Sequence, residues 1–295
     1  MTQYVPVLRT KLAEWMALRL LPEDVRRAVT PCLELLPQEL ALSHGEAHNH
    51  LPHAVRRFAK KIRRSWGRRP IFVDASHINP SVRPATAALL AEVAPAYGIS
   101  PIWILRLHED VSSQLVAGRA AEGGTLRLAL RVNYDELDKD DATDRIDVVL
   151  RTLGVSLADT DLLVEYGVVD ATPPDYEWLE EHAPYFHDWR EFVVVGGSFL
   201  PDLSGLAVGT RFHPRWDWLH WEAWARVTRH REVRLPVFSD YTIHHAIFRE
   251  PVEGANPSAS IRYTAEDYWV ILRGEAVYNR RMKESRYNTS VTLNS

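Results

Sequence analysis

PIFVDASHINPSVRPATAALLAEVAPAYGISPIWILRL, residues 70–107, contains two apolar runs on either side of a helical segment. Residues 70–75 (PIFVDA) and 100–107 (SPIWILRL) have the length and the β-branched or aromatic content of buried strands. Residues 84–97 between them predict a helix that Gly98 ends. A strand, a helix and a second strand in this order predict one unit of a parallel sheet.

The same pattern recurs along the chain at a spacing of roughly 25–35 residues. Strands are predicted at residues 4–9, 29–35, 70–75, 100–107, 125–132, 161–166, 192–197 and 235–238. Helices are predicted at 11–27, 54–66, 84–97, 111–121, 144–153, 174–181 and 215–228, and the first should bury a broad apolar face that includes Leu12, Trp15, Met16, Leu18 and Leu20. Eight strands that alternate with helices predict a closed, TIM-like (β/α)8 barrel in the α/β class.

A doubly wound open sheet is the alternative architecture, although no Gly-x-Gly-x-x-Gly follows the first strand. We expect one barrel domain over residues 1–295. Aromatic-rich runs between Ser260 and Gly274 predict a C-terminal β-hairpin at the barrel mouth.

The composition narrows the class of protein. The chain has 295 residues, 46% of them hydrophobic, and a formal net charge of −4, so nothing global demands a nucleic-acid partner. No run approaches the ~18 apolar residues that span a bilayer, and the first residues lack a signal-peptide pattern. A lone cysteine, Cys32, excludes an internal disulfide. These features predict a cytoplasmic protein without a membrane partner.

Polar residues end nearly every predicted strand. In chain order they are Lys11, Glu34, Asp74, Arg106, Arg131, Glu165 with Asp170, Gly197 with Ser198, and Asp240. The carboxyl ends of barrel strands form the face that carries active sites. Side chains alternate along a strand, so Asp74 should point the same way as Phe72, and Arg106 the same way as Ile104. Taken singly, each residue could equally cap a helix or form a rim salt bridge; as a set, they predict a pocket for a polar, anionic ligand.

Three arrangements would give this pocket its chemistry. Asp240 and Tyr241 are expected to face Arg262, the alternative being a structural ion pair that holds the hairpin. Ser198, which follows Gly196-Gly197, is expected to bind phosphate together with Arg211 and Arg215, the alternative being a strand end that needs glycine only for a tight turn. Carboxylates that could hold Mg²⁺ or Mn²⁺ are Glu34, Asp74, Asp170 and Asp240.

Residues 56–69 (RRFAKKIRRSWGRR) contain eight basic residues and no acid. On an amphipathic helix these charges form an outward strip that can bind nucleic acid or an acidic partner protein. The strip consists of Arg56, Arg57, Lys60, Lys61 and Arg64. The alternative is a solvated helix face whose charge is balanced by the acidic residues 135–147.

Several segments carry a family resemblance. They are YVPVLRTKLAEWMAL at the start, VTPCLEL at 29–35, RWDW at 215–218, FSDYTIHH at 238–245 and SASIRYTAEDYWVILRG at 258–274. Together they resemble the "beta protein" family of bacteria and phages, most specifically from Asp240 onward. The resemblance implies that the gene lies near DNA-modification and antiphage genes. It assigns no catalytic residues to this chain. The family's C-terminal segment rich in Trp, Gly and His is not evident after Tyr278, so we expect this chain to be truncated or divergent there.

Two functions fit these observations. The first is a barrel that binds a ligand or a partner protein within an antiphage defence system. The alternative is a metal-assisted hydrolase of a phosphorylated or nucleotide-like substrate. In that case Asp74 and Asp240 are the catalytic or metal-binding acids, and the arginines that hold the anion are Arg106, Arg131, Arg215 and Arg262.

Overall fold

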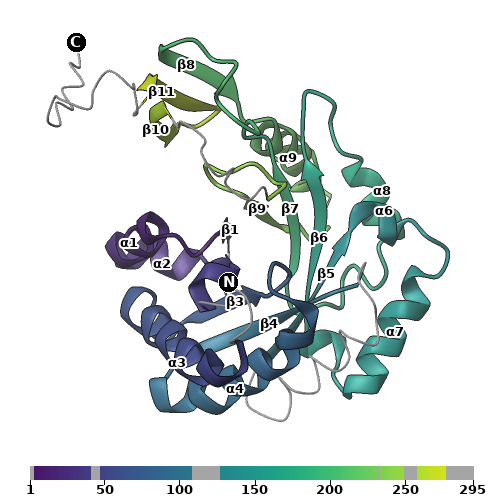
Figure 1. Cartoon of the computed structure of the whole chain (residues 1–295). Helices are drawn as coiled ribbons and strands as arrows, with labels where there is room; N and C mark the ends of the chain where they lie inside the picture. Colours follow the sequence, from purple (N-terminus) through teal and green to yellow (C-terminus); the bar gives the residue numbers. More distant parts are fainter. Residues whose placement is uncertain (1–2, 41–46, 108–126, 232, 249–257, 277–295) are drawn as a thin grey trace, which may run out of the picture.

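The computed structural model describes residues 3–40, 47–107, 127–231, 233–248 and 258–276, and its centre is a closed barrel of eight parallel strands (Figure 1). The strands in order are β1 (Tyr4–Leu8), β2 (Cys32–Glu34), β3 (Pro70–Asp74), β4 (Ser100–Arg106), β5 (Arg127–Asn133), β6 (Asp161–Val168), β7 (Phe192–Gly197) and β9 (Val237–Asp240). The last strand pairs with the first, which closes the barrel. The predicted α/β barrel is therefore confirmed, and the open sheet is excluded.

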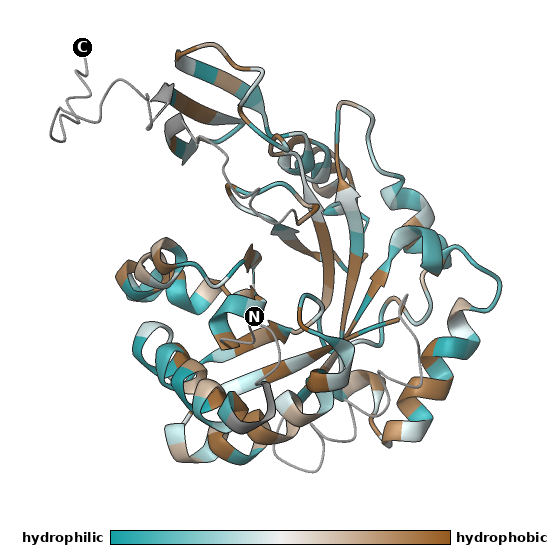
Figure 2. Cartoon of the chain, in the orientation of Figure 1, coloured by the Kyte–Doolittle hydropathy of each residue, from teal (hydrophilic) through white to brown (hydrophobic). Residues whose placement is uncertain are grey.

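Helices cover the outside of this barrel. They are α1 (Leu12–Leu20), α2 (Glu23–Ala28), α3 (Ala47–Ser65), α4 (Arg83–Tyr97), α6 (Tyr134–Leu137), α7 (Ala142–Leu153), α8 (Tyr176–His182) and α9 (Trp216–Thr228), with 3-10 turns at Pro37–Leu40, Pro80–Val82 and Leu157–Asp159. In Figure 2 the strands are largely hydrophobic and the outward helix faces hydrophilic. The helix predicted at residues 111–121 lies outside the described residues.

A second sheet stands beside the barrel. It has three antiparallel strands in the order β10 (Ser258–Thr264), β11 (Tyr268–Ala276) and β8 (Gly209–Pro214). Strands β10 and β11 are the predicted hairpin. Strand β8 was not predicted, because its residues GTRFHP lack a hydrophobic alternation; it is a strand because β11 pairs with it from Pro214 to Gly209.

The predicted helix at 11–27 is wrong in two respects. Pro22 divides it into α1 and α2, since proline lacks an N–H and forces the preceding Leu21 into an extended conformation. Its apolar face is also narrower than expected. Trp15 and Leu18 are buried, whereas the other long apolar side chains are exposed, namely Leu12 at 77%, Met16 at 54% and Leu20 at 74%.

The barrel interior contains two kinds of side chain. Apolar residues fill most of it, among them Val5, Cys32, Phe72, Ile104, Ala129, Leu163 and Val193. Near the carboxyl ends of the strands, the ring of Tyr241 enters the interior against Gly197. A Cβ placed on Gly197 would come within 2.9 Å of Cδ2 of that ring. Gly197 therefore leaves the space that Tyr241 fills.

Gly197→Ala should destabilise the protein by about 1–3 kcal/mol, because the added methyl group must displace a fully buried ring. Urea unfolding of the variant measures this loss. Gly205→Ala is the matched control, since a Cβ there meets nothing within 4 Å. Equal stability of the two variants would contradict the packing argument.

Candidate functional site

The alternation of each strand brings one polar side chain from almost every strand into the barrel mouth. Glu34 lies two residues after Cys32, Asp74 after Phe72, Arg106 after Ile104, Arg131 after Ala129 and Glu165 after Leu163, and the earlier residue of each pair belongs to the interior cluster. The predicted orientations of Asp74 and Arg106 are thus confirmed. We call the resulting set, with Arg9 and Tyr241, the mouth cluster.

Arg131 is the centre of this cluster and has no exposed side-chain surface. Its Nη1 lies 2.8 Å from Oδ2 of Asp74, and its Nε donates to Oε2 of Glu165 at 3.0 Å. Its Nη2 donates to the hydroxyl of Tyr241, which in turn donates to Glu165. Every side of this guanidinium therefore meets an oxygen atom.

Arg106 makes a second set of contacts with the same acids. Its Nη2 lies 2.7 Å from Oδ2 of Asp74, and its Nη1 lies 3.3 Å from Oε2 of Glu165. Arg9 extends the network, since its Nε lies 3.3 Å from Oε2 of Glu34. Three arginines and three carboxylates give the cluster a formal charge of zero.

The arginines keep the carboxylates ionised despite burial. Burial raises the pKa of Glu165, but the charges of Arg131 and Arg106 outweigh it and lower that pKa to about 2. Burial also raises the pKa of Asp74, but the charges of Arg106 and Arg131 outweigh it and hold that pKa far below its ordinary value. Burial raises the pKa of Tyr241 well above its ordinary value, so its hydroxyl stays protonated. At neutral pH the acids accept hydrogen bonds and do not donate protons.

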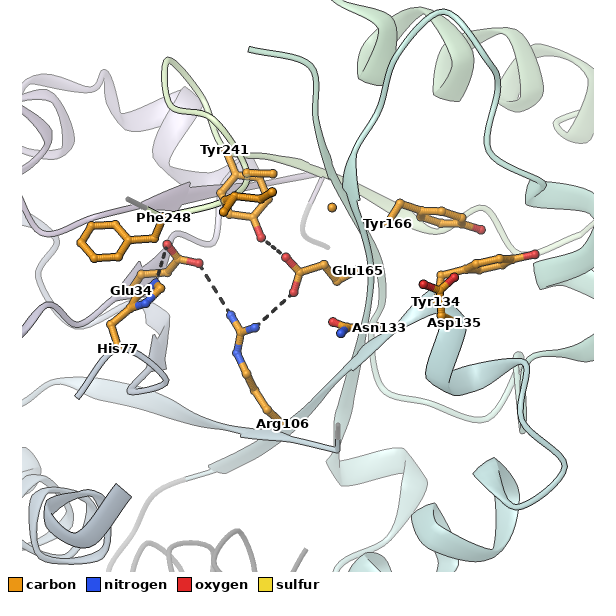
Figure 3. A pocket seen from close by; sticks show the side chains of 13 residues that line it. Glu34, His77, Arg106, Asn133, Tyr134, Asp135, Glu165, Tyr166, Tyr241 and Phe248 are labelled. Carbon is orange, nitrogen blue, oxygen red and sulfur yellow. Dashed lines mark hydrogen bonds and ion pairs between the residues drawn. The ribbon is translucent and has the colours of Figure 1, made fainter. Parts of the chain in front are cut away.

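A cavity of about 420 Å³ opens above the mouth cluster (Figure 3). Its lining includes Glu34, His77, Arg106, Asn133, Tyr134, Asp135, Glu165, Tyr166, Gly167, Tyr241, Ala246, Ile247 and Phe248. Tyr134 and Tyr166 stack on each other on one side, with ring centroids 4.7 Å apart. Phe248 and His77 lie together on the other side.

The structure gathers six of the predicted pocket residues at this cavity. Glu34, Arg106, Glu165 and Tyr241 line it, and Asp74 and Arg131 lie buried among them. The residues at the junction of β5 and α6, Asn133 to Asp135, were missed, as were His77 and Phe248. Asn133 ends strand β5 as a polar residue and could have been found from that signal, whereas Phe248 comes from a loop that has no periodic pattern.

Ser198, Arg215 and Asp240 form a separate cluster on the helix-facing side of the barrel wall. Asp240 accepts from the Tyr4 hydroxyl at 2.6 Å and from Nη2 of Arg215 at 3.1 Å. Ser198 donates to Asp217 of α9. The predicted placing of Ser198 and Asp240 in the mouth pocket is wrong. Each is adjacent in sequence to an inward-pointing residue, Gly197 or Tyr241, and adjacent residues on a strand point to opposite faces.

Arg262 does not face Asp240 or Tyr241, which corrects a second prediction. Its Nη1 donates to the backbone oxygen of Ile243 at 3.0 Å, and its guanidinium lies over the ring of Phe199. Arg215 pairs with Asp240 instead and also donates to the backbone oxygens of Ala265 and Glu266. Arg215 therefore joins the barrel to the turn of the β10–β11 hairpin.

The predicted carboxylate site for Mg²⁺ or Mn²⁺ is not formed. Glu34 and Asp74 belong to the mouth cluster, Asp240 belongs to the helix-facing cluster, and Asp170 is exposed on a loop. Arginines occupy the space between the mouth acids. In the part of the chain that the structure describes, no three His, Cys, Asp or Glu side chains are grouped so that they could hold a metal ion.

The basic strip lies away from both clusters, on the outer face of α3. Arg56, Arg57, Lys60 and Arg64 are exposed there, and Lys61 is half-buried beside Glu39. No helix among the described residues is long and apolar enough to cross a membrane.

Comparisons with known proteins identify the family and little beyond it. A family model described as "Beta protein" matches residues 4–290. Among solved structures, one match is a "GH138 enzyme targeting pectin rhamnogalacturonan II", with 10% sequence identity and a TM-score of 0.42. The match covers 83% of this chain and 35% of that one, so this chain spans about a third of its length. No curated protein has significant sequence similarity to the chain.

Glu165 should contribute to acid stability. Its pKa of about 2 in the folded protein lies below the ordinary value of 4.5, so its contribution is present above pH ~4.5 and is lost as the pH falls towards 2. We expect Glu165→Gln to weaken the dependence of the free energy of unfolding on pH in this window, as measured by urea unfolding. Glu181→Gln, at an exposed position, should leave that dependence unchanged; a similar effect of both variants would contradict the assignment.

Asp217 should change the pH dependence of stability in the opposite direction to Glu165. Burial, assisted by the charge of Asp240, raises the pKa of Asp217 to about 6 from an ordinary 3.8. The folded state then holds this proton more tightly, and the stability that it confers is lost as the pH rises through 6. Asp217→Asn, which mimics the protonated form, should therefore gain stability relative to the wild type between pH 4.5 and 7.5. Asp170→Asn on the exposed loop is the control. If the free energy of unfolding of each variant differs from that of the wild type by the same amount at every pH, this expectation is contradicted.

Proposed function

The chain belongs to the beta protein family, and we propose that it is a binding barrel. The ligand is a small neutral or cationic molecule that is rich in hydrogen-bond donors, such as a polyol or an amine. Its site is the cavity above the mouth cluster.

The composition of the lining carries this proposal. Oxygen acceptors reach the cavity from Glu34, Asp135, Glu165 and Asn133, and Arg106 is the one arginine among the described residues of its lining. Carboxylates that stay ionised are strong acceptors for O–H and N–H groups. The rings of Tyr134, Tyr166 and Phe248 add apolar surface beside these acceptors, as is typical of small-molecule sites.

This lining disfavours the anionic ligand that the strand-end arginines predict. Arg106 and Arg131 already bind Asp74 and Glu165, so a phosphate group would have to compete with both carboxylates. It would also approach the exposed carboxylate of Asp135. A donor-rich ligand meets no such competition.

Binding is better supported than hydrolysis. The two acids proposed to be catalytic lie in different clusters, with Asp74 beneath the cavity and Asp240 on the helix-facing side. The arginines beside Glu165 hold its pKa near 2, so this carboxylate orients a ligand but does not supply a proton at neutral pH.

The role in antiphage defence and a defence-system partner stay predictions. They rest on the genes that lie near members of the family, and neither the fold nor the comparisons test this neighbourhood. Deleting the gene in its host and measuring phage plating efficiency would test the role.

A thermal-shift screen of polyols, amines and phosphorylated compounds tests the proposed ligand. A ligand at a hundred times its dissociation constant stabilises by about 2.7 kcal/mol, and we expect such a shift with a donor-rich neutral or cationic compound. Asp135→Asn should weaken its binding by about tenfold, because a charge-assisted hydrogen bond contributes about 1.5–3 kcal/mol.

Asp138→Asn is the matched control, since Asp138 is exposed one helical turn away and does not line the cavity. It should leave the affinity unchanged. Shifts that occur only with phosphorylated compounds would overturn the proposal.

A further inference from the structure

The outer face of α3 and the turn after it has an unusual composition. From residue 53 to residue 68, every exposed side chain is basic: His53, Arg56, Arg57, Lys60, Arg63, Arg64 and Arg68. The apolar residues of the same stretch, such as Phe58, Ile62 and Trp66, are fully buried. We call these exposed residues from Arg56 to Arg68 the α3 strip.

Most of the basic residues from Arg56 to Arg69, within and beside the α3 strip, have no acidic partner. Lys61 pairs with Glu39, Arg69 pairs with Glu23, and Arg57 donates to the backbone oxygen of Glu39. Within the described ranges, Arg56, Lys60, Arg63, Arg64 and Arg68 form no ion pair with any acid. Five permanent cations therefore face solvent together.

The acidic segment does not balance this charge, which corrects the alternative based on residues 135–147. That segment forms α6 and α7, on the opposite side of the barrel from α3 (Figure 1). Glu136 pairs there with Lys139 and Arg145. The protein thus has a net charge of −4 and a segregated positive face.

From these observations we infer that the α3 strip binds the phosphate backbone of a nucleic-acid duplex. From Arg56 to Arg64 the helix rises about 12 Å, at about 1.5 Å per residue. Duplex DNA carries about seven phosphate charges over that length. Four of the five unpaired cations are arginines, whose planar guanidinium groups match phosphate oxygens in pairs.

A nucleic acid fits the strip better than an acidic protein does. Protein interfaces have an apolar or aromatic centre, and the strip exposes no such residue. A duplex fits better than a single strand, because single-strand binding relies on aromatic rings that stack on bases. Phe58 and Trp66 lie beneath the strip and are not available for stacking. Binding should therefore be independent of base sequence.

This surface is distinct from the proposed ligand site. The backbone oxygen of Arg68 accepts from the Ser100 hydroxyl at 2.9 Å, so the strip ends near the amino end of strand β4. The mouth cavity lies at the opposite ends of the strands. Failure of one proposal therefore leaves the other intact.

Fluorescence anisotropy with a labelled 20-base-pair duplex tests the inference. We expect the affinity to fall about 10²-fold between 50 and 200 mM salt, since four to five phosphate contacts give a log–log slope near −4. The double variant Lys60→Glu with Arg64→Glu should lose most of the binding at 50 mM salt. The neutral double variant Lys60→Gln with Arg64→Gln should reduce the slope by about 2.

Arg226→Glu with Arg229→Glu is the matched control, because it changes the net charge equally at exposed positions at the end of α9. It should retain binding, and melting temperatures verify that each variant is folded. No binding at 50 mM salt, or equal loss in the control, would overturn the inference. Preference for polyglutamate would indicate an acidic protein partner instead, and tighter binding of a (dT)20 strand would exclude the duplex.

Discussion

Arg131 sets the constraint on which the barrel mouth depends. A guanidinium without any exposed surface must be neutralised where it lies, because an unpaired buried charge costs several kcal/mol. Asp74 and Glu165 supply that charge, and Tyr241 completes the hydrogen bonds. The acids in turn need Arg106, since one arginine cannot compensate three carboxylates. The charges of the mouth cluster sum to zero, His77 adds a further contact to Glu34, and the cavity lies above the cluster.

The alternation of side chains divides the polar strand ends between two sides of the barrel wall. Strand-end residues on the same face as the interior residues form the mouth cluster. Strand-end residues on the opposite face contact the helices. Ser198 and Asp240 belong to the second group. Their contacts with Asp217 and Arg215 hold α9 and the three-stranded sheet against the barrel. At the end of β9, Asp240 joins this second group and the next residue, Tyr241, joins the mouth cluster.

The fold could be predicted because its signals are local. Apolar strands such as residues 70–75 and 100–107 are visible one at a time, and their spacing identifies a barrel. The orientation of Asp74 and Arg106 followed from alternation alone. Strand β8 could not be found in this way, since only its pairing with the distant β11 makes it a strand. The predicted partner of Asp240 was wrong for a similar reason. The sequence offers both Arg215 and Arg262, and only the packing of α9 shows which of them pairs with Asp240.

The mouth cluster also has a consequence for the order of synthesis. Arg131 donates to Tyr241, which lies 110 residues later, and Tyr4 donates to Asp240, 236 residues later. A nascent chain that has emerged only as far as β7 therefore carries its arginines and carboxylates without the tyrosine between them or the strand that closes the barrel. Water must solvate these charges until β9 leaves the ribosome. Barrel closure in the cell is thus a late step, in which the last strand replaces that water.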